Sequence, residues 1–62
     1  MKAIEISVEL TESEAMQYAQ FLKRVCFSDY EQRATSEREA YTMLAAGEKI
    51  RDALREQGYA PR

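Results

Sequence analysis

The hydrophobic pattern of this chain changes its period at Leu10 and Thr11, and this change limits what the chain can fold into. Residues 2–10 alternate between apolar and other side chains, as in a β-strand with one buried face. From Thr11 onward, apolar residues recur at the spacing of a helix. The apolar face of the first segment carries Ile4, Ile6, Val8 and Leu10, and its other face carries Ala3, Glu5, Ser7 and Glu9. The pattern predicts one strand followed only by helices.

A single strand leaves its backbone N–H and C=O groups unpaired, and residues 11–62 contain no second alternating segment that could pair with it. We therefore expect the strand to pair with a second copy of the chain in a homodimer, or with a partner chain. The predicted fold class is α+β: one N-terminal strand and two main helices (βαα), with or without a short helix between them, and the strand paired across a dimer.

The length of 62 residues allows one small domain, residues 1–62, because a chain of this size buries only about 60% of the surface that it exposes when unfolded. The composition of 45% hydrophobic and 32% charged residues is typical of a folded chain. The formal net charge is −2, which is too mild to indicate nucleic-acid binding. With no apolar run of membrane-spanning length and no signal-peptide pattern, we expect a cytoplasmic protein without a membrane partner.

The first helix is predicted to begin at a capping box formed by Thr11 and Glu14. Its apolar stripe is wide enough to pack against the strand and also against a second helix or subunit. The stripe contains Ala15, Tyr18, Ala19, Leu22, Val25 and Cys26, with Met16 and Phe21 on either side.

The second long helix is predicted to begin at another box, Ser36 to Glu39, and to end near Gln57. Between the two helices, a further box from Ser28 to Glu31 leaves open a short helix or a turn over residues 29–33. The stripe of the second helix contains Ala40, Met43, Leu44, Gly47, Ile50 and Leu54.

Two glycines have predicted roles in and after this second helix. Gly47 lies in the middle of the stripe, where a missing side chain favours the close approach of another helix backbone. Gly58 fits the left-handed position after the helix, with Tyr59 packing back on Leu54, and Pro61 prevents continuation.

The residues that usually carry catalysis or metal binding are scarce. The chain has no histidine and one cysteine, and no phosphate-binding or nucleophile motif is found. Cys26 lies on the apolar stripe, which favours a buried, inert thiol over a nucleophile. Glu12 and Glu14 are explained by helix capping. We therefore expect a protein that is not an enzyme and that uses no metal and no cofactor.

The candidate partner-binding residues are two tyrosines and an acidic ridge. Tyrosine is enriched in interface hot spots, and Tyr30 and Tyr41 lie off the main apolar stripes. Acidic residues spaced by four on the second helix are typical of a solvated face, and they also suit a partner with a basic surface. This ridge consists of Glu48, Asp52 and Glu56.

A strand followed by two helices resembles the ribbon-helix-helix regulators, in which two N-terminal strands pair and enter the major groove of DNA. The base-reading positions implied by this resemblance are Ala3, Glu5, Ser7 and Glu9. Carboxylates at two of these positions would be repelled by DNA phosphates. The connection over residues 26–35 is also longer than the tight turn of that family, so a dimeric DNA-binding transcriptional regulator is the alternative function.

A second resemblance rests on three stretches: Ala19–Arg24 (AQFLKR), Phe27–Tyr30 (FSDY) and the ending Gly58–Arg62 (GYAPR). They are similar to small uncharacterised proteins of bacterial phages, plasmids and other mobile elements. Such elements encode many compact proteins without enzymatic activity, including anti-CRISPR proteins. The resemblance lies in the type of protein and its genetic setting, and it carries no function of its own. Our leading interpretation of the chain is a small protein that acts by stoichiometric protein–protein binding, with inhibition of a host defence complex as one form of that activity.

Overall fold

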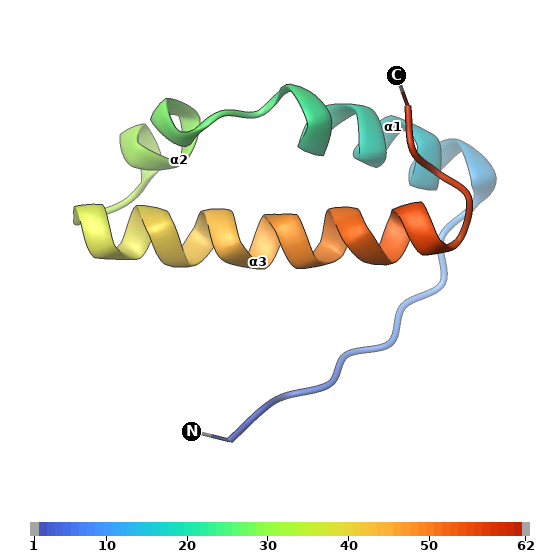
Figure 1. Ribbon diagram of the computed structural model, residues 1–62, viewed down its shortest axis with the longest axis horizontal. Helices are drawn as coiled ribbons and strands as arrows, with labels where there is room; N and C mark the ends of the chain where they lie inside the picture. The colour runs from blue at the N-terminus through green and yellow to red at the C-terminus, as the bar shows by residue number, and fades with distance from the viewer. Residues whose placement is uncertain (1, 62) are drawn as a thin grey trace.

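A computed structural model describes residues 2–61 and places three helices there: α1 (Glu12–Arg24), α2 (Phe27–Arg33) and α3 (Glu37–Glu56). The long helix α3 runs the length of the molecule, and α1 and α2 follow one another along the same side of it, each in contact with it (Figure 1). Residues 2–10 form an extended arm that leaves the start of α1 and passes along the other side of α3 (Figure 1). The molecule is flat, measuring 34 × 29 × 15 Å.

The predicted α+β fold, with a βαα order and a strand paired across a dimer, is wrong. Within residues 2–61 the only regular elements are helices, and residues 2–10 are extended without forming a strand. An alternating pattern specifies an extended backbone, but a strand also needs a neighbour that supplies its hydrogen-bond partners. The described chain offers the arm no such neighbour, so the protein is all-α.

Helix α1 begins as its capping box predicts. The Thr11 N–H donates to Glu14 Oε1 at 2.9 Å, and the Glu14 N–H donates to Thr11 Oγ1 at 3.1 Å. The stripe that follows is narrower than predicted, because Tyr18 and Phe21 stack on each other in solvent with ring centroids 5.6 Å apart. The helix also ends at Arg24, before the end of the predicted stripe, and packs on α3 alone.

The region from Cys26 to Arg33 is a short helix, which resolves the alternatives left open by the sequence. Its cap is Cys26, not Ser28: the Cys26 N–H donates to Asp29 Oδ2 at 2.9 Å, and its Sγ lies 3.2 Å from the same oxygen. These two donors lower the pKa of the Asp29 carboxyl. The thiol is exposed, so the prediction of a buried cysteine was wrong. A backbone that leaves α1 at Val25 carries Cys26 out of the apolar stripe.

Helix α3 begins and ends where predicted, but only half of the predicted Ser36–Glu39 capping box forms. Ser36 Oγ accepts from the Glu39 N–H at 3.1 Å, while the Glu39 carboxylate turns to Thr35, whose Oγ1 donates to it at 2.8 Å. After the helix, Gly58 has a φ of 96°, and the Tyr59 N–H donates to the Leu54 carbonyl at 2.9 Å. This is the predicted Schellman ending, and Tyr59 packs against the core as expected.

The core lies where α1 and α3 meet and consists mostly of small side chains. Its buried members are Ala15, Ala19, Leu22 and Leu54, and Ala40 and Gly47 on α3 are buried as well. A Cβ added to Gly47 would collide with the Tyr30 hydroxyl and would lie 3.7 Å from Leu22 Cδ2. The missing side chain of Gly47 therefore admits a tyrosine side chain, where we had predicted the close approach of another helix backbone.

Candidate functional site

The two predicted anchor tyrosines have different surroundings. Tyr30, on α2, points toward α3 and is half-buried, with its hydroxyl against Gly47. Burial, assisted by the neighbouring Tyr18, Glu48 and Asp29, raises the pKa of Tyr30. Tyr41, on α3, is 55% exposed and packs against Phe27 with ring centroids 4.5 Å apart. Tyr30 therefore joins two helices, and of the two only Tyr41 offers a large part of its ring to a partner.

The predicted acidic ridge is exposed along the flank of α3, where Glu48, Asp52 and Glu56 all reach solvent. Tyr41, Glu48 and Asp52 share one face of the helix, because spacings of seven and eleven residues return to the same side. Asp52 is paired with Arg55 at 3.1 Å, with both side chains more than half exposed, which offsets one of the three charges. The structure therefore brings Tyr41, Glu48 and Asp52 together on one face of α3, and Tyr30 lies half-buried between α2 and α3 with Glu48 nearby.

The largest unpartnered apolar feature is the arm, which the prediction had assigned to a paired strand. Its side chains Ile4, Ile6, Val8 and Leu10 are 85%, 72%, 72% and 47% exposed. Contiguous apolar surface of this kind marks an interaction site in a folded protein. The arm thus keeps the alternating apolar face that the sequence shows, but nothing within residues 2–61 covers it.

A groove runs between the arm and the C-terminal half of α3. Its volume is about 650 Å³, within the range of sites that hold a ligand or a segment of chain. Ser7, Gln57 and the hydroxyl-bearing Tyr59 supply its polar groups, and no lining residue is charged. The lining residues are Ile6, Ser7, Val8, Leu10, Ala15, Ile50, Ala53, Leu54, Gln57 and Tyr59. Such a groove suits an apolar occupant.

The exposed surface of the whole chain is larger than that of a compact monomer. The accessible area is 5538 Å², whereas the scaling for folded monomers gives about 4,100 Å² for a mass of 7.2 kDa, a difference of about 1,400 Å². The radius of gyration of 12.6 Å also exceeds the value of about 11 Å for a compact chain of this length. The chain by itself leaves surface uncovered that other folded chains of its size bury.

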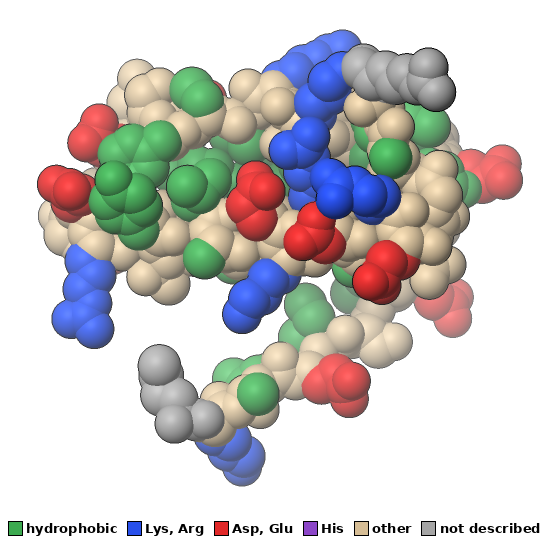
Figure 2. Space-filling view, in the orientation of Figure 1, with side chains coloured by type: hydrophobic (Ala, Val, Ile, Leu, Met, Phe, Trp, Pro, Cys, Tyr) green, Lys and Arg blue, Asp and Glu red, His purple; other side chains and the backbone are tan. Residues whose placement is uncertain are grey.

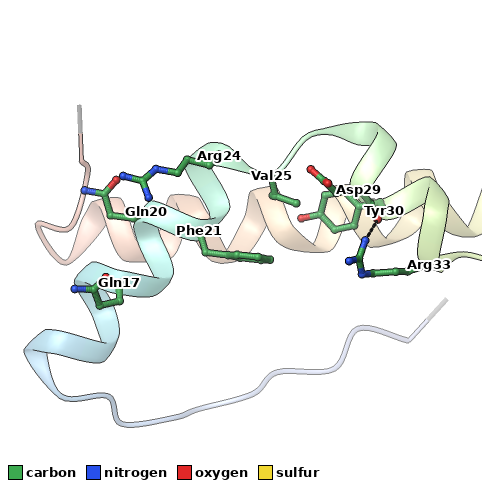
Figure 3. A pocket seen from close by; sticks show the side chains of 8 residues that line it. All are labelled: Gln17, Gln20, Phe21, Arg24, Val25, Asp29, Tyr30 and Arg33. Carbon is green, nitrogen blue, oxygen red and sulfur yellow. Dashed lines mark hydrogen bonds between the residues drawn. The ribbon is translucent and has the colours of Figure 1, made fainter.

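A second hollow, of about 430 Å³, lies between α1 and α2 (Figure 3). Phe21, Val25 and Tyr30 line it, together with the guanidinium groups of Arg24 and Arg33 (Figure 3). Arg33 Nη1 donates to the Asp29 carbonyl at 3.0 Å, which holds this side chain along the rim. Asp29 also lines the hollow, which therefore mixes apolar groups with charges of both signs, in contrast to the uncharged groove beside the arm.

Residues 2–61 contain neither a cluster of metal-ligating side chains nor a membrane-spanning helix. No three side chains among His, Cys, Asp and Glu lie close enough together there to hold a metal ion. In the same residues, no helix combines the length and the apolar character needed to cross a membrane.

The space-filling view shows how the charged and apolar groups are distributed on one face (Figure 2). Acidic side chains follow the middle and right of the α3 layer, an apolar cluster lies at its left end, and apolar side chains line the space between the arm and the helices. The arm and its groove are the functional candidates that the site prediction missed. The alternation of residues 4–10 indicates this surface, but the sequence interpretation gave these residues to a strand paired with a second copy or a partner chain and placed the binding site on Tyr30, Tyr41 and the acidic ridge.

The family model described as "Family of unknown function (DUF7706)" matches residues 1–62, the whole chain. Neither the comparison with curated proteins nor the comparison with solved structures gave a match.

Proposed function

We propose that this chain, which belongs to the DUF7706 family of unknown function, is a non-enzymatic protein that acts by stoichiometric binding of another protein chain through its arm. The observation that carries the proposal is the exposure of the four aliphatic side chains at positions 4, 6, 8 and 10. A folded body with a separate apolar arm has a ready surface for a partner and no need of a reacting group.

The apolar surface of the arm supplies a large part of the free energy that association needs. Full burial of one aliphatic side chain contributes about 1.5–3 kcal/mol, so covering the area still exposed on these four would contribute about 4–8 kcal/mol. Ordering the arm and losing the freedom of two separate molecules oppose this gain. Contact with the groove beside the arm adds further apolar area, which favours a partner that touches the arm and α3 together.

DNA is the less favoured partner. Glu5 and Glu9 on the other face of the arm would meet phosphates with like charge. A gel-shift assay with genomic DNA at low salt would reveal even non-specific binding. A shifted band would support the alternative of a DNA-binding regulator. Inhibition of a host defence complex, and contact with a basic partner through Tyr41 and the acidic ridge, stay predictions.

Photo-crosslinking in cells tests the proposal. A photoreactive amino acid at Ile6 should form discrete crosslinks to a protein chain, which mass spectrometry would identify. The control places the same group at Lys49, which is exposed on α3 and does not line the groove. We expect adducts from position 6 and few from position 49. An arm that forms no protein adduct would contradict the proposed function.

A further inference from the structure

We infer that the chain that covers the arm is a second copy of this protein, with each arm seated in the groove between the arm and α3 of the other copy. This inference rests on the proposed function, since it names the partner of the same surface. The groove sets the first requirement for an occupant: because most of its lining side chains are aliphatic and none is charged, an occupant with apolar side chains fits it best.

The arm meets this requirement better than the other exposed apolar groups of the chain. The pairs Tyr18–Phe21 and Phe27–Tyr41 each place two rings side by side on helices and do not form a row of side chains along an extended segment. The arm is already extended and carries apolar side chains on one face, with Glu5 and Glu9 on the other. Its apolar face can therefore enter the groove while both carboxylates stay in water.

The lengths of the groove and the arm also agree. The α3 wall runs from Ile50 to Gln57, a rise of about 11 Å along the helix. The segment from Ile4 to Val8 spans about 13 Å when extended. An arm of a second copy therefore fills the wall from end to end without a change in its own backbone.

Two copies that exchange their arms form a closed dimer. The arm is at once a wall of its own groove and the occupant of its partner's groove, so a single two-fold interface covers both arms and leaves neither free for a third chain. The surplus surface of about 1,400 Å² per chain exceeds the roughly 800 Å² that one partner buries in a standard interface. The area available is therefore sufficient for a stable dimer.

Sedimentation equilibrium of the purified chain tests this inference. We expect a mass of twice 7.2 kDa at micromolar concentration. Ile6→Asp puts a charge into the groove and should raise the dimer dissociation constant by about 100-fold or more. The matched control Ala3→Asp adds the same charge to the other face of the same arm and should leave the constant within a few-fold of the parent.

A second variant tests the contribution of the α3 wall of the groove separately from that of the arm. Ile50→Asp changes the α3 wall and should weaken the dimer as Ile6→Asp does, while circular dichroism confirms that the helices are retained. A parent chain that is monomeric at about 100 µM would overturn the inference, as would a dimer that neither variant weakens. A purified monomer whose Ile6 crosslinks to a different protein in cells would overturn the second copy and leave the proposed function standing.

Discussion

The arm and the helical body, which consists of α1, α2 and α3, both carry a regular apolar pattern, but only the body buries it. Helices α1 and α3 supply their own backbone hydrogen bonds, so their apolar faces need only meet, as they do at Leu22 and Leu54. The arm needs a neighbour for its backbone and its side chains alike, and Ile4, Ile6 and Val8 remain mostly in solvent. An apolar pattern therefore predicts which face will be covered, and the secondary structure decides whether the chain can cover it alone.

The largest difference between the two regions should appear on truncation of an aliphatic side chain. Leu22→Ala should lower the free energy of unfolding by about 2–5 kcal/mol, because Leu22 is only 4% exposed and its loss leaves a cavity. Ile6→Ala should leave the free energy of unfolding of the monomer nearly unchanged. Chemical denaturation at nanomolar concentration measures both. Equal losses would show that the arm is part of the core.

A tight fit is expected only inside the body, and Gly47 tests it. Gly47→Ala should lower the free energy of unfolding by about 1–3 kcal/mol, because the new methyl group would overlap the Tyr30 hydroxyl. Adding Tyr30→Phe removes that hydroxyl and leaves the nearest ring carbon 3.4 Å away, so the double variant should recover much of the loss. Thermal unfolding of the parent, the two single variants and the double variant gives the coupling free energy between Gly47 and Tyr30. Additive effects would mean that the two residues do not touch.

Where the arm meets α1, loss of a hydroxyl should lower the free energy of unfolding on the helix side and not on the arm side. Thr11→Ala should lower the free energy of unfolding by about 0.5–2 kcal/mol, because the Glu14 N–H loses its hydroxyl acceptor at the start of α1. Ser7→Ala, which removes a hydroxyl from the arm, is the matched control and should have no measurable effect on the monomer. Denaturant midpoints compare the two. A similar cost at position 7 would extend the cooperative unit into the arm.

The smallest expected effect is a dependence on alkaline pH that belongs to the body alone. The pKa of Tyr30 is raised in the folded chain, so the unfolded chain loses this proton first, from its usual value of 10.0. The contribution of the protonated Tyr30 hydroxyl to the free energy of unfolding is therefore complete below pH 10.0. It is lost as the pH rises through the pKa that Tyr30 has in the folded chain. The parent should lose more stability than Tyr30→Phe over this range. Parallel pH profiles would refute the assignment.

The helices could be predicted from the sequence because their ends depend on local contacts. The Thr11–Glu14 box, the Ser36 cap and the Gly58 ending each involve residues within five positions of one another. Cys26 could not be placed in the same way, since its exposure follows from the backbone turn at Val25. The missing strand depends on a neighbour, which no local pattern can supply.

The candidate site was predictable only in part for a related reason. The exposure of Tyr41 and of Glu48, Asp52 and Glu56 follows from their distance from the apolar stripe of α3. Tyr30 lies off both predicted stripes, and its burial depends on the missing side chain of Gly47 on another helix. To predict the groove, one would need to know the direction in which the arm leaves α1, and local sequence patterns do not specify it.

The small side chains of the core have a consequence for how the sequence can drift. Ala19 and Ala40 are 1% and 0% exposed, and Gly47 has no room for a further atom beside Tyr30. Selection for folding alone would therefore restrict these positions by volume and not by polarity. A pool of random variants passed through such selection should retain Ala, Gly and Ser at positions 19 and 40 and Gly at position 47, and should lose Leu and Phe at all three, although the latter are more apolar.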